Sequence, residues 1–227
     1  MAKVNRLSEA DHALVSAAVS EAERGTDGEI VTIVTDVSDA YHDAALHWAI
    51  GIMFLALALF AVFPEKIIAL LTWLASGWEH EFTLGEILPV IFVLLALKFL
   101  AVRYILAWTP LRLALTPRAT KARRVRRRAI QYFKVGAESR TMKRTGVLIY
   151  LSMREHMAEI VADEAVHRAV APEAWGDAMA ALIDRVRDGH PGAGMAAAVA
   201  EVGKILAAHF PKDHEDPNEL PDRLIEL

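Results

Sequence analysis

The chain has 227 residues, of which 54% are hydrophobic, and 25 Lys and Arg against 29 Asp and Glu give a formal net charge of -4 at pH 7. This hydrophobic fraction is high for a purely soluble protein, so the length allows one or two soluble domains, or one domain together with a membrane part. The sequence contains no cysteine, which excludes disulfides, thiolate zinc sites and cysteine nucleophiles.

The first 43 residues predict one helix followed by one strand. Ser8 is a good N-cap residue with Asp11 at the acidic position of a capping box, and Gly25 ends the helix. The segment 29–35 is β-branched and apolar on both faces, which is typical of a buried strand. No apolar signal region precedes it, so we expect the N-terminus on the cytoplasmic side. One helix and one strand cannot bury a core by themselves.

Two apolar segments predict transmembrane helices. Residues 45–63 carry no charge, and about 19 helical residues reach roughly 29 Å, enough to cross the hydrocarbon core. Residues 87–108 are also apolar but contain Lys98 and Arg103. We expect Lys98 to extend its side chain to the cytoplasmic surface, the alternative being an intramembrane functional charge. The apolar residues 65–78 between them are too short to cross and lie either in the outer interface or in a re-entrant segment.

The charges that flank these segments predict their orientation. The stretch after the second segment is rich in Lys and Arg and holds no acid, so the positive-inside rule places it in the cytoplasm. Both termini are then expected on the cytoplasmic side of a bacterial inner membrane. We interpret the stretch as facing anionic lipid rather than nucleic acid, because the nearby Tyr132 and Phe133 look like the core face of a helix. Its residues are Arg118, Lys121, Arg123, Arg124, Arg126, Arg127 and Arg128.

The soluble part after the membrane segments predicts a strand hairpin with helices around it. A short helix covers 128–136, and the sequence RTGVLIYLSMREHMAEIVAD then predicts two strands joined by a turn at 152–156. Helices over 172–189 and 192–210 follow, before a polar, proline-broken tail. A two-stranded hairpin is marginal alone, so we expect the strand at 29–35 to join its sheet.

The two soluble parts each supply what the other lacks. We therefore predict one cytoplasmic α/β unit with three αβα layers, assembled from residues 1–43 and 110–211. A transmembrane helical hairpin within residues 44–109 interrupts this unit, and residues 212–227 form a C-terminal tail.

Several blocks of the sequence resemble the TPM-domain family, which is named for a thylakoid lumen protein, a photosystem-associated protein and a worm receptor modulator. The resemblance covers about residues 8–36 and 120–223. It implies a three-layer αβα fold and either an acid phosphatase activity or a role in calcium binding and assembly. The usual layout keeps the domain contiguous and exports it, whereas two membrane segments split it here. The blocks are AERGTDGEIVTIV, RTGVLIYLSMREHMAEIVAD, the tryptophan of PEAWGDAM, AAVAEVGKILAAHFP and DPNELPD.

Acidic residues follow the ends of two predicted strands. Asp36 and Asp39 come after the first strand, and Asp163 and Glu164 come after the last. Ligand sites of open α/β sheets lie outside the carboxyl ends of strands. If the two strands run parallel, these carboxylates converge and bind a hard cation such as calcium or magnesium. Otherwise they are solvated loop acids and helix N-terminal charges.

No catalytic residue is predicted, because the sequence holds no phosphatase nucleophile motif and no phosphate-binding glycine loop. We predict a membrane-anchored, TPM-like interaction or assembly module that carries a candidate divalent-cation site. The alternative is a weak metal-dependent acid phosphatase that uses the same acids. Expected partners are the anionic lipids of the bilayer and a further protein, with self-association left open and no nucleic acid.

Overall fold

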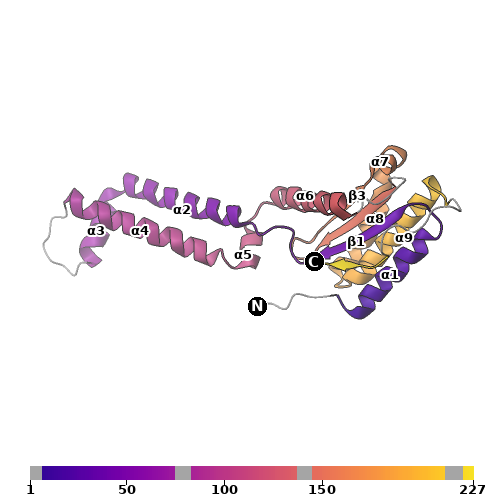
Figure 1. The fold of residues 1–227 in the computed structure, drawn as a ribbon. Helices are drawn as coiled ribbons and strands as arrows, with labels where there is room; N and C mark the ends of the chain where they lie inside the picture. Colours follow the sequence, from indigo (N-terminus) through magenta and orange to yellow (C-terminus); the bar gives the residue numbers. More distant parts are fainter. Residues whose placement is uncertain (1–6, 75–82, 137–144, 213–221) are drawn as a thin grey trace. The chain divides into compact units, whose positions relative to one another are not determined.

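The computed structural model describes residues 7–74, 83–136, 145–212 and 222–227 (Figure 1). The chain divides into two compact parts. The α/β unit comprises residues 1–39 and 118–227, and the helical unit comprises residues 40–117.

The α/β unit is built on a four-stranded mixed sheet in the order β3-β2-β1-β4. Its strands are β1 (Glu29–Thr35), β2 (Gly146–Ser152), β3 (Met157–Ala162) and β4 (Ile225–Glu226). Strands β1 and β2 run parallel and stay in register along their full length, while β3 returns antiparallel to β2. The prediction that 29–35 joins the sheet of the hairpin is confirmed. The sheet therefore joins two parts of the sequence that the helical unit separates.

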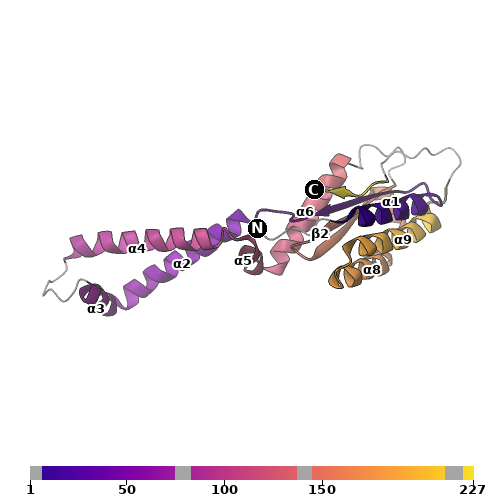
Figure 2. The ribbon, with the colours of Figure 1, turned by 90° about the horizontal axis from the view of Figure 1, so that it is seen from below.

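Helices cover both faces of this sheet (Figures 1 and 2). On one face lie α1 (Glu9–Glu23), α8 (Trp175–Arg187) and α9 (Pro191–His209), and on the other lies α6 (Arg118–Gly136). Successive side chains of a strand point to opposite faces, so a strand between two helix layers is mainly apolar on both faces. This explains the apolar residues on both faces of β1, all of whose residues are buried, including Thr32 in its middle.

The two helix layers give the sheet two apolar cores. The core toward α1, α8 and α9 takes alternate residues of β1 and β2, and the core toward α6 takes the residues between them. The first core includes Ile30, Val34, Val147, Ile149 and Leu151, and the second includes Val31, Ile33, Leu148 and Tyr150.

Helix α1 begins as the sequence predicts. The Ser8 hydroxyl accepts from Asp11 N at 3.1 Å, and the Asp11 carboxylate accepts from Ser8 N at 3.0 Å, which completes a capping box. The buried face of α1 then packs on α9, where Gly203 lies against Ala22. A Cβ on Gly203 would lie 2.6 Å from the Ala22 Cβ, so this helix pair requires glycine at that position.

We expect Gly203→Ala to lower the free energy of unfolding of the α/β unit by about 1–3 kcal/mol, because the two helices must separate to admit one methyl group. Gly176→Ala is the matched control, since nothing lies within 4 Å of a Cβ there. That variant should stabilise α8 by up to about 1 kcal/mol through helix propensity. Hydrogen exchange of the β1 and β2 amides measures both effects, and equal protection in the two variants would contradict the close approach.

Several elements differ from the predictions made for the second soluble part and for the tail. Helix α6 begins at Arg118, ten residues before the predicted start, and therefore contains the whole basic stretch. A short helix, α7 (Glu164–Ala169), follows β3 directly, and a 3-10 turn at Pro172–Ala174 precedes α8. Part of the predicted tail is ordered, because β4 pairs parallel with β1 and Leu224 is buried; residues 213–221 of the tail lie outside the described residues.

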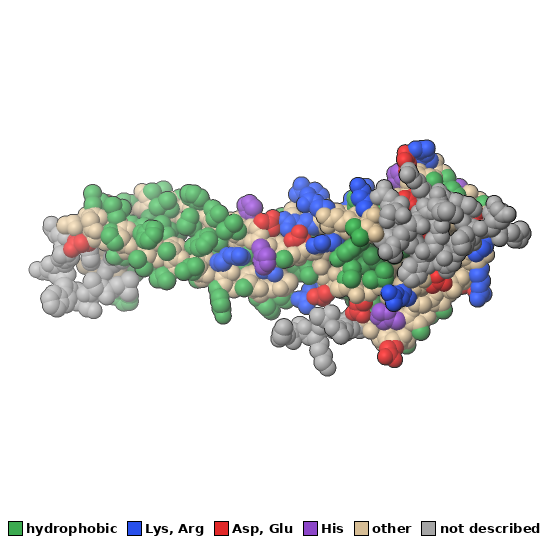
Figure 3. Space-filling view, in the orientation of Figure 1, with side chains coloured by type: hydrophobic (Ala, Val, Ile, Leu, Met, Phe, Trp, Pro, Cys, Tyr) green, Lys and Arg blue, Asp and Glu red, His purple; other side chains and the backbone are tan. Residues whose placement is uncertain are grey.

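The helical unit contains α2 (His42–Val62), α3 (Pro64–Leu74), α4 (Leu84–Ile105) and α5 (Thr109–Ala114). Helices α2 and α4 contact each other like the arms of a hairpin, and both are long and apolar enough to cross a membrane. In α4 none of the most apolar window is buried, and in α2 17% of it is. Figure 3 accordingly shows hydrophobic side chains over the surface of these helices.

These findings support two candidate spans by length and composition, with the second helix shifted toward Leu84 from the predicted 87–108. Helix α3 occupies most of the predicted interfacial segment, and residues 75–78 of that segment lie outside the described residues. The choice between an interfacial and a re-entrant position stays a prediction.

Candidate functional site

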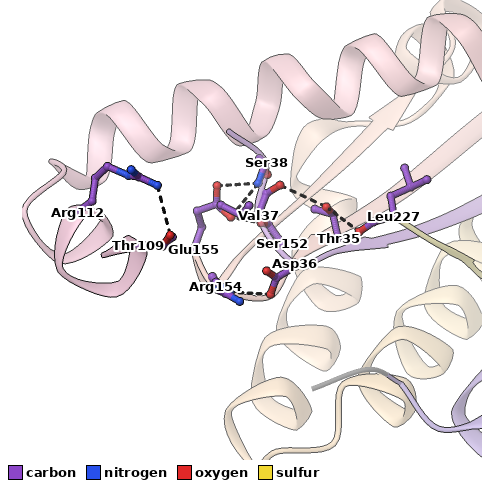
Figure 4. A network of polar contacts seen from close by, with 10 residues as sticks. All are labelled: Thr35, Asp36, Val37, Ser38, Thr109, Arg112, Ser152, Arg154, Glu155 and Leu227. Atoms are coloured by element: carbon purple, nitrogen blue, oxygen red, sulfur yellow. Dashed lines mark hydrogen bonds and ion pairs between the residues drawn. The ribbon is translucent and has the colours of Figure 1, made fainter. Parts of the chain in front are cut away.

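A buried polar network lies where β1 and β2 end (Figure 4). Glu155, 3% exposed, is at its centre and accepts hydrogen bonds from Ser38 N at 2.9 and 3.1 Å and from the Ser152 hydroxyl. The Tyr150 hydroxyl lies 2.9 Å from Ser38 Oγ, and burial raises the pKa of Tyr150 to about 12. We call these four residues the strand-end network, which joins the segment after β1 to the turn after β2.

Arginines pair with both predicted metal ligands in the segment after β1. Asp36 Oδ1 lies 2.8 Å from Arg154 Nε, and Asp39 Oδ1 lies 2.8 Å from Arg124 Nη1. Arg128 Nε also donates to Ser38 O at 2.9 Å. These carboxylates therefore already have cationic partners from the β2–β3 turn and from α6, and the contacts fasten the segment in place.

The other two predicted ligands lie at the opposite end of the sheet. Asp163 Oδ2 accepts from Gly146 N at 3.0 Å, beside the first residue of β2, and Glu164 pairs with Arg168 within α7. Because β3 runs antiparallel to β2 while β1 runs parallel to it, the carboxyl ends of β1 and β3 point in opposite directions. The predicted convergence of Asp36 and Asp163 is therefore wrong. Among the described residues, no three His, Asp or Glu side chains are grouped so as to hold a metal ion.

The predicted lipid-facing basic residues take three different places on α6. One face of the helix packs into the core through Val125, Ala129 and Phe133. The charged side chains therefore lie on its other faces. Arg124 and Arg128 hold the segment after β1, and Arg118 and Lys121 line a cavity of the α/β unit. The exposed members are Arg118, at the rim of that cavity, and Arg123, Arg126 and Arg127. The segment is therefore a structural helix, only part of which is free to face a lipid surface.

A cavity of about 510 Å³ lies along the edge strand β3, and we call it the β3 groove. Helix α6 lines one side of it, α8 lines the other, and the β2–β3 hairpin lies between them. The α8 wall is mainly apolar, with Met179, Ile183 and Val186. Three cationic side chains, Arg118, Lys121 and Arg187, and two acidic ones, Glu155 and Glu159, also line the groove.

Strand β3 is an edge strand in the described part of the chain, and half of its backbone groups point away from β2. Asp163 N donates to Gly146 O at 2.9 Å, so this pair stands at a hydrogen-bonded position of the ladder, with Gly146 N donating to the Asp163 carboxylate. Bonded and non-bonded pairs alternate in an antiparallel ladder, so Ala158, Ile160 and Ala162 point their N–H and C=O groups away from β2. An edge of this kind is a template for another strand.

The two sides of the β3 groove differ in chemistry. Side chains of β3 at even positions, such as Ala158, pack toward the face of α8, while Met157 packs toward α6. Glu159 lies on the α6 side, where burial raises the pKa of its carboxyl and the charge of Arg126 lowers it. A strand added beside β3 would therefore alternate between an apolar wall and a wall that carries Arg118 and Lys121.

Sequence reasoning missed the β3 groove. Two signals point toward it: the spacing of Val125, Ala129 and Phe133 within the basic stretch, which marks a helix face, and the polar Glu159 in an otherwise apolar strand. The groove itself arises from the packing of α6 and α8 around a strand edge, which no local pattern records.

The fold as a whole matches a solved structure. It is similar to the NMR structure of the BA42 protein from the psychrophilic bacterium Bizionia argentinensis, a TPM-like domain protein, with a TM-score of 0.57 and 16% sequence identity over 100% of both chains. The chain resembles a TPM-like protein in fold. No protein-family model matches the chain, and no curated protein matches it either. The family resemblance of the sequence blocks is thus supported at the level of the fold alone.

Proposed function

We propose that this protein is a membrane-anchored interaction module whose β3 groove binds an extended segment of a partner protein by strand addition. Helices α2 and α4 form the anchor, and the α/β unit presents the groove on the cytoplasmic side of a bacterial inner membrane. The observation that carries the proposal is the open edge of β3 between α6 and α8, within a cavity that three cations line.

The connection between the two units supports an anchor with both ends on one side. Strands β1 and β2 are neighbours in one sheet, and the chain between them passes through α2 and α4. A pair of spanning helices inserted between adjacent strands must return the chain to the side from which it left. The basic α6, which follows the second helix, favours the cytoplasmic side by the positive-inside rule.

The chemistry of the groove selects the partner segment. Strand addition supplies main-chain hydrogen bonds, and the pockets for alternate side chains supply specificity. Apolar side chains suit the α8 wall, and acidic side chains suit Arg118 and Lys121 on the α6 wall. The proposed ligand is therefore an extended peptide in which apolar and acidic residues alternate. A second copy of the chain would bring the same cations together, so charge disfavours self-pairing at this edge.

A labelled octapeptide of alternating valine and glutamate, titrated onto the full chain in lipid nanodiscs, tests the proposal. We expect Arg187→Glu to weaken binding about ten-fold, because it reverses one cation of the groove. Arg185→Glu is the matched control, since Arg185 is exposed on the same last turn of α8 but does not line the cavity. Its binding should equal that of the unchanged chain.

A backbone variant separates strand addition from simple charge attraction. Ala158→Pro removes an N–H that points away from β2, so the β2–β3 ladder should survive as it does for prolines at sheet edges. We expect this variant to bind the peptide about ten-fold more weakly. Equal affinity of Ala158→Pro and the unchanged chain would contradict the proposal, as would equal binding of a peptide of the same composition with its acids in one block. Dimerisation that Ala158→Pro abolishes would show a second copy in the groove instead.

The alternative function, a metal-dependent acid phosphatase, has no observation in its favour. Its predicted acids lie at opposite ends of the sheet, and Asp36, Asp39 and Glu164 are each paired with an arginine. The same separation removes the geometric basis of the predicted calcium or magnesium site.

A further inference from the structure

Two arginines of the helical unit line one cavity, and no acidic side chain is among the described residues of its wall. The cavity, about 790 Å³, is lined by Arg103 from the last turn of α4, Arg112 from α5 and His42 from the start of α2. Its apolar part continues along α4 with Leu97 and Leu100, whose side chains are exposed. The cavity thus combines cationic groups with an open apolar wall.

Arg112 is only 7% exposed, yet its guanidinium is incompletely bonded. Nη1 donates to Leu106 O and Nη2 to Thr109 Oγ1, both at 3.3 Å, and these bonds are long for charged donors. Figure 4 shows the bond to Thr109. Nε is buried and has no hydrogen-bond partner. Burial lowers the pKa of Arg112, and the nearby charge of Arg103 lowers it further.

A buried cation without a counter-ion is costly, and a second cation beside it adds to the cost. Across residues 7–74, 83–136, 145–212 and 222–227, neither Arg103 nor Arg112 forms an ion pair with a carboxylate. A phosphate group would offset part of the positive charge of the two guanidinium groups and accept from several of their N–H donors. The arrangement therefore fits a phosphate-bearing anion better than a neutral ligand.

We propose that this cavity binds the phosphate of an anionic phospholipid, with its acyl chain along Leu97 and Leu100. The inference rests on the membrane anchoring of the proposed function and adds a specific lipid to it. A spanning α4 would place Arg103 at the headgroup level, where cationic side chains meet lipid phosphates. Inorganic phosphate shares the anionic chemistry but leaves the apolar wall unused.

Native mass spectrometry of the full chain in detergent tests the inference. It measures the retention of phosphatidylglycerol and phosphatidylcholine with identical acyl chains. We expect preferential retention of phosphatidylglycerol, and we expect Arg103→Gln to reduce this preference about five-fold, at about 1 kcal/mol for a lost charged contact. Arg112→Gln should act in the same direction. Lys98→Gln is the matched control, because it removes one charge from α4 outside the cavity lining and should keep the preference.

The following outcomes decide the inference. A preference lost in Arg103→Gln and kept in Lys98→Gln supports it. Equal retention of the two lipids, or equal loss in both variants, overturns it. Inorganic phosphate that displaces the bound lipid completely would assign the site to a free anion and overturn the lipid. A chain that inserts into membranes without lipid preference defeats only this site, whereas a chain that stays out of membranes defeats the anchoring as well.

Discussion

Raising the pH from 5 to 9 is expected to weaken the α/β unit by about a few kcal/mol, and Glu23→Gln is expected to remove most of this loss. Glu23 ends α1, is 7% exposed, and accepts a hydrogen bond from Ile30 N at 2.8 Å. Burial raises the pKa of its carboxyl from 4.5 to about 8; the bond from Ile30 opposes the shift, and the nearby carboxyls of Glu29 and Asp222 add to it.

The sign of the effect follows from proton binding. The folded-state pKa of Glu23 lies above its ordinary value, so between pH 4.5 and about 8 the folded chain holds a proton that the unfolded chain has released. The stability linked to this proton is complete below 4.5 and is lost as the pH rises through 8. Each unit of pKa difference corresponds to about 1.4 kcal/mol. Glutamine keeps an oxygen for Ile30 N and has no charge to acquire, so the stability of the Glu23→Gln variant should change much less with pH.

The unfolding free energy of the α/β unit, followed by hydrogen exchange of β1 and β2 amides across this pH range, provides the measurement. Glu21→Gln is the control, because Glu21 lies on the same helix but forms only an exposed pair with Arg24. Its profile should match that of the unchanged chain. Starting at pH 5 excludes the lowered pKa of Asp11, which affects stability at more acidic pH. A Glu23→Gln profile as steep as the original would show that another group carries the proton.

The central strands were predictable because burial on both faces requires apolar residues on both faces, and this pattern is visible in the sequence. Ile30–Val34 and Val147–Leu151 are apolar on both faces, a pattern that only strands with helices on both sides require. The direction of one strand relative to the other produces no such pattern in the sequence. The predicted cation site depended on this direction. Because β1 is parallel to β2 and β3 is antiparallel to it, Asp163 after β3 lies at the opposite end of the sheet from the end of β1.

Two other differences have the same origin in contacts distant along the sequence. The core face of α6 has only three strongly apolar positions in its middle, Val125, Ala129 and Phe133, set among arginines, so charge dominated the local pattern. Strand β4 has two residues and no β-sheet pattern of its own; it exists because Ile225 and Glu226 pair with Ile33 and Val34. The β3 groove likewise needs α6 and α8 together, which only the assembled sheet provides.

Replacing Glu155 by alanine is expected to cost the α/β unit about 3 kcal/mol or more. The substitution leaves Ser38 N and the Ser152 hydroxyl without their acceptor, and Ser38 and Ser152 are 2% and 0% exposed. A buried donor without a partner costs about 1–3 kcal/mol, and two donors lose theirs here. Glu155→Gln keeps one acceptor oxygen but turns an NH₂ group toward these donors, so its cost should lie between those of alanine and the unchanged chain.

Because of the position of the strand-end network, Glu155→Ala should destabilise the segment after β1 more than the rest of the α/β unit. Ser38 belongs to the segment that leads from β1 into α2, and Glu155 belongs to the turn that leads from β2 into β3. Hydrogen exchange of the Ser38 amide should therefore accelerate more than that of mid-strand amides such as Leu148. Arg154→Ala is the matched control in the same turn, because it removes only the partly exposed pair with Asp36, worth about 0–1 kcal/mol. Equal costs for Glu155→Ala and Arg154→Ala would mean that the hydrogen bonds to Glu155 contribute no more than a partly exposed ion pair.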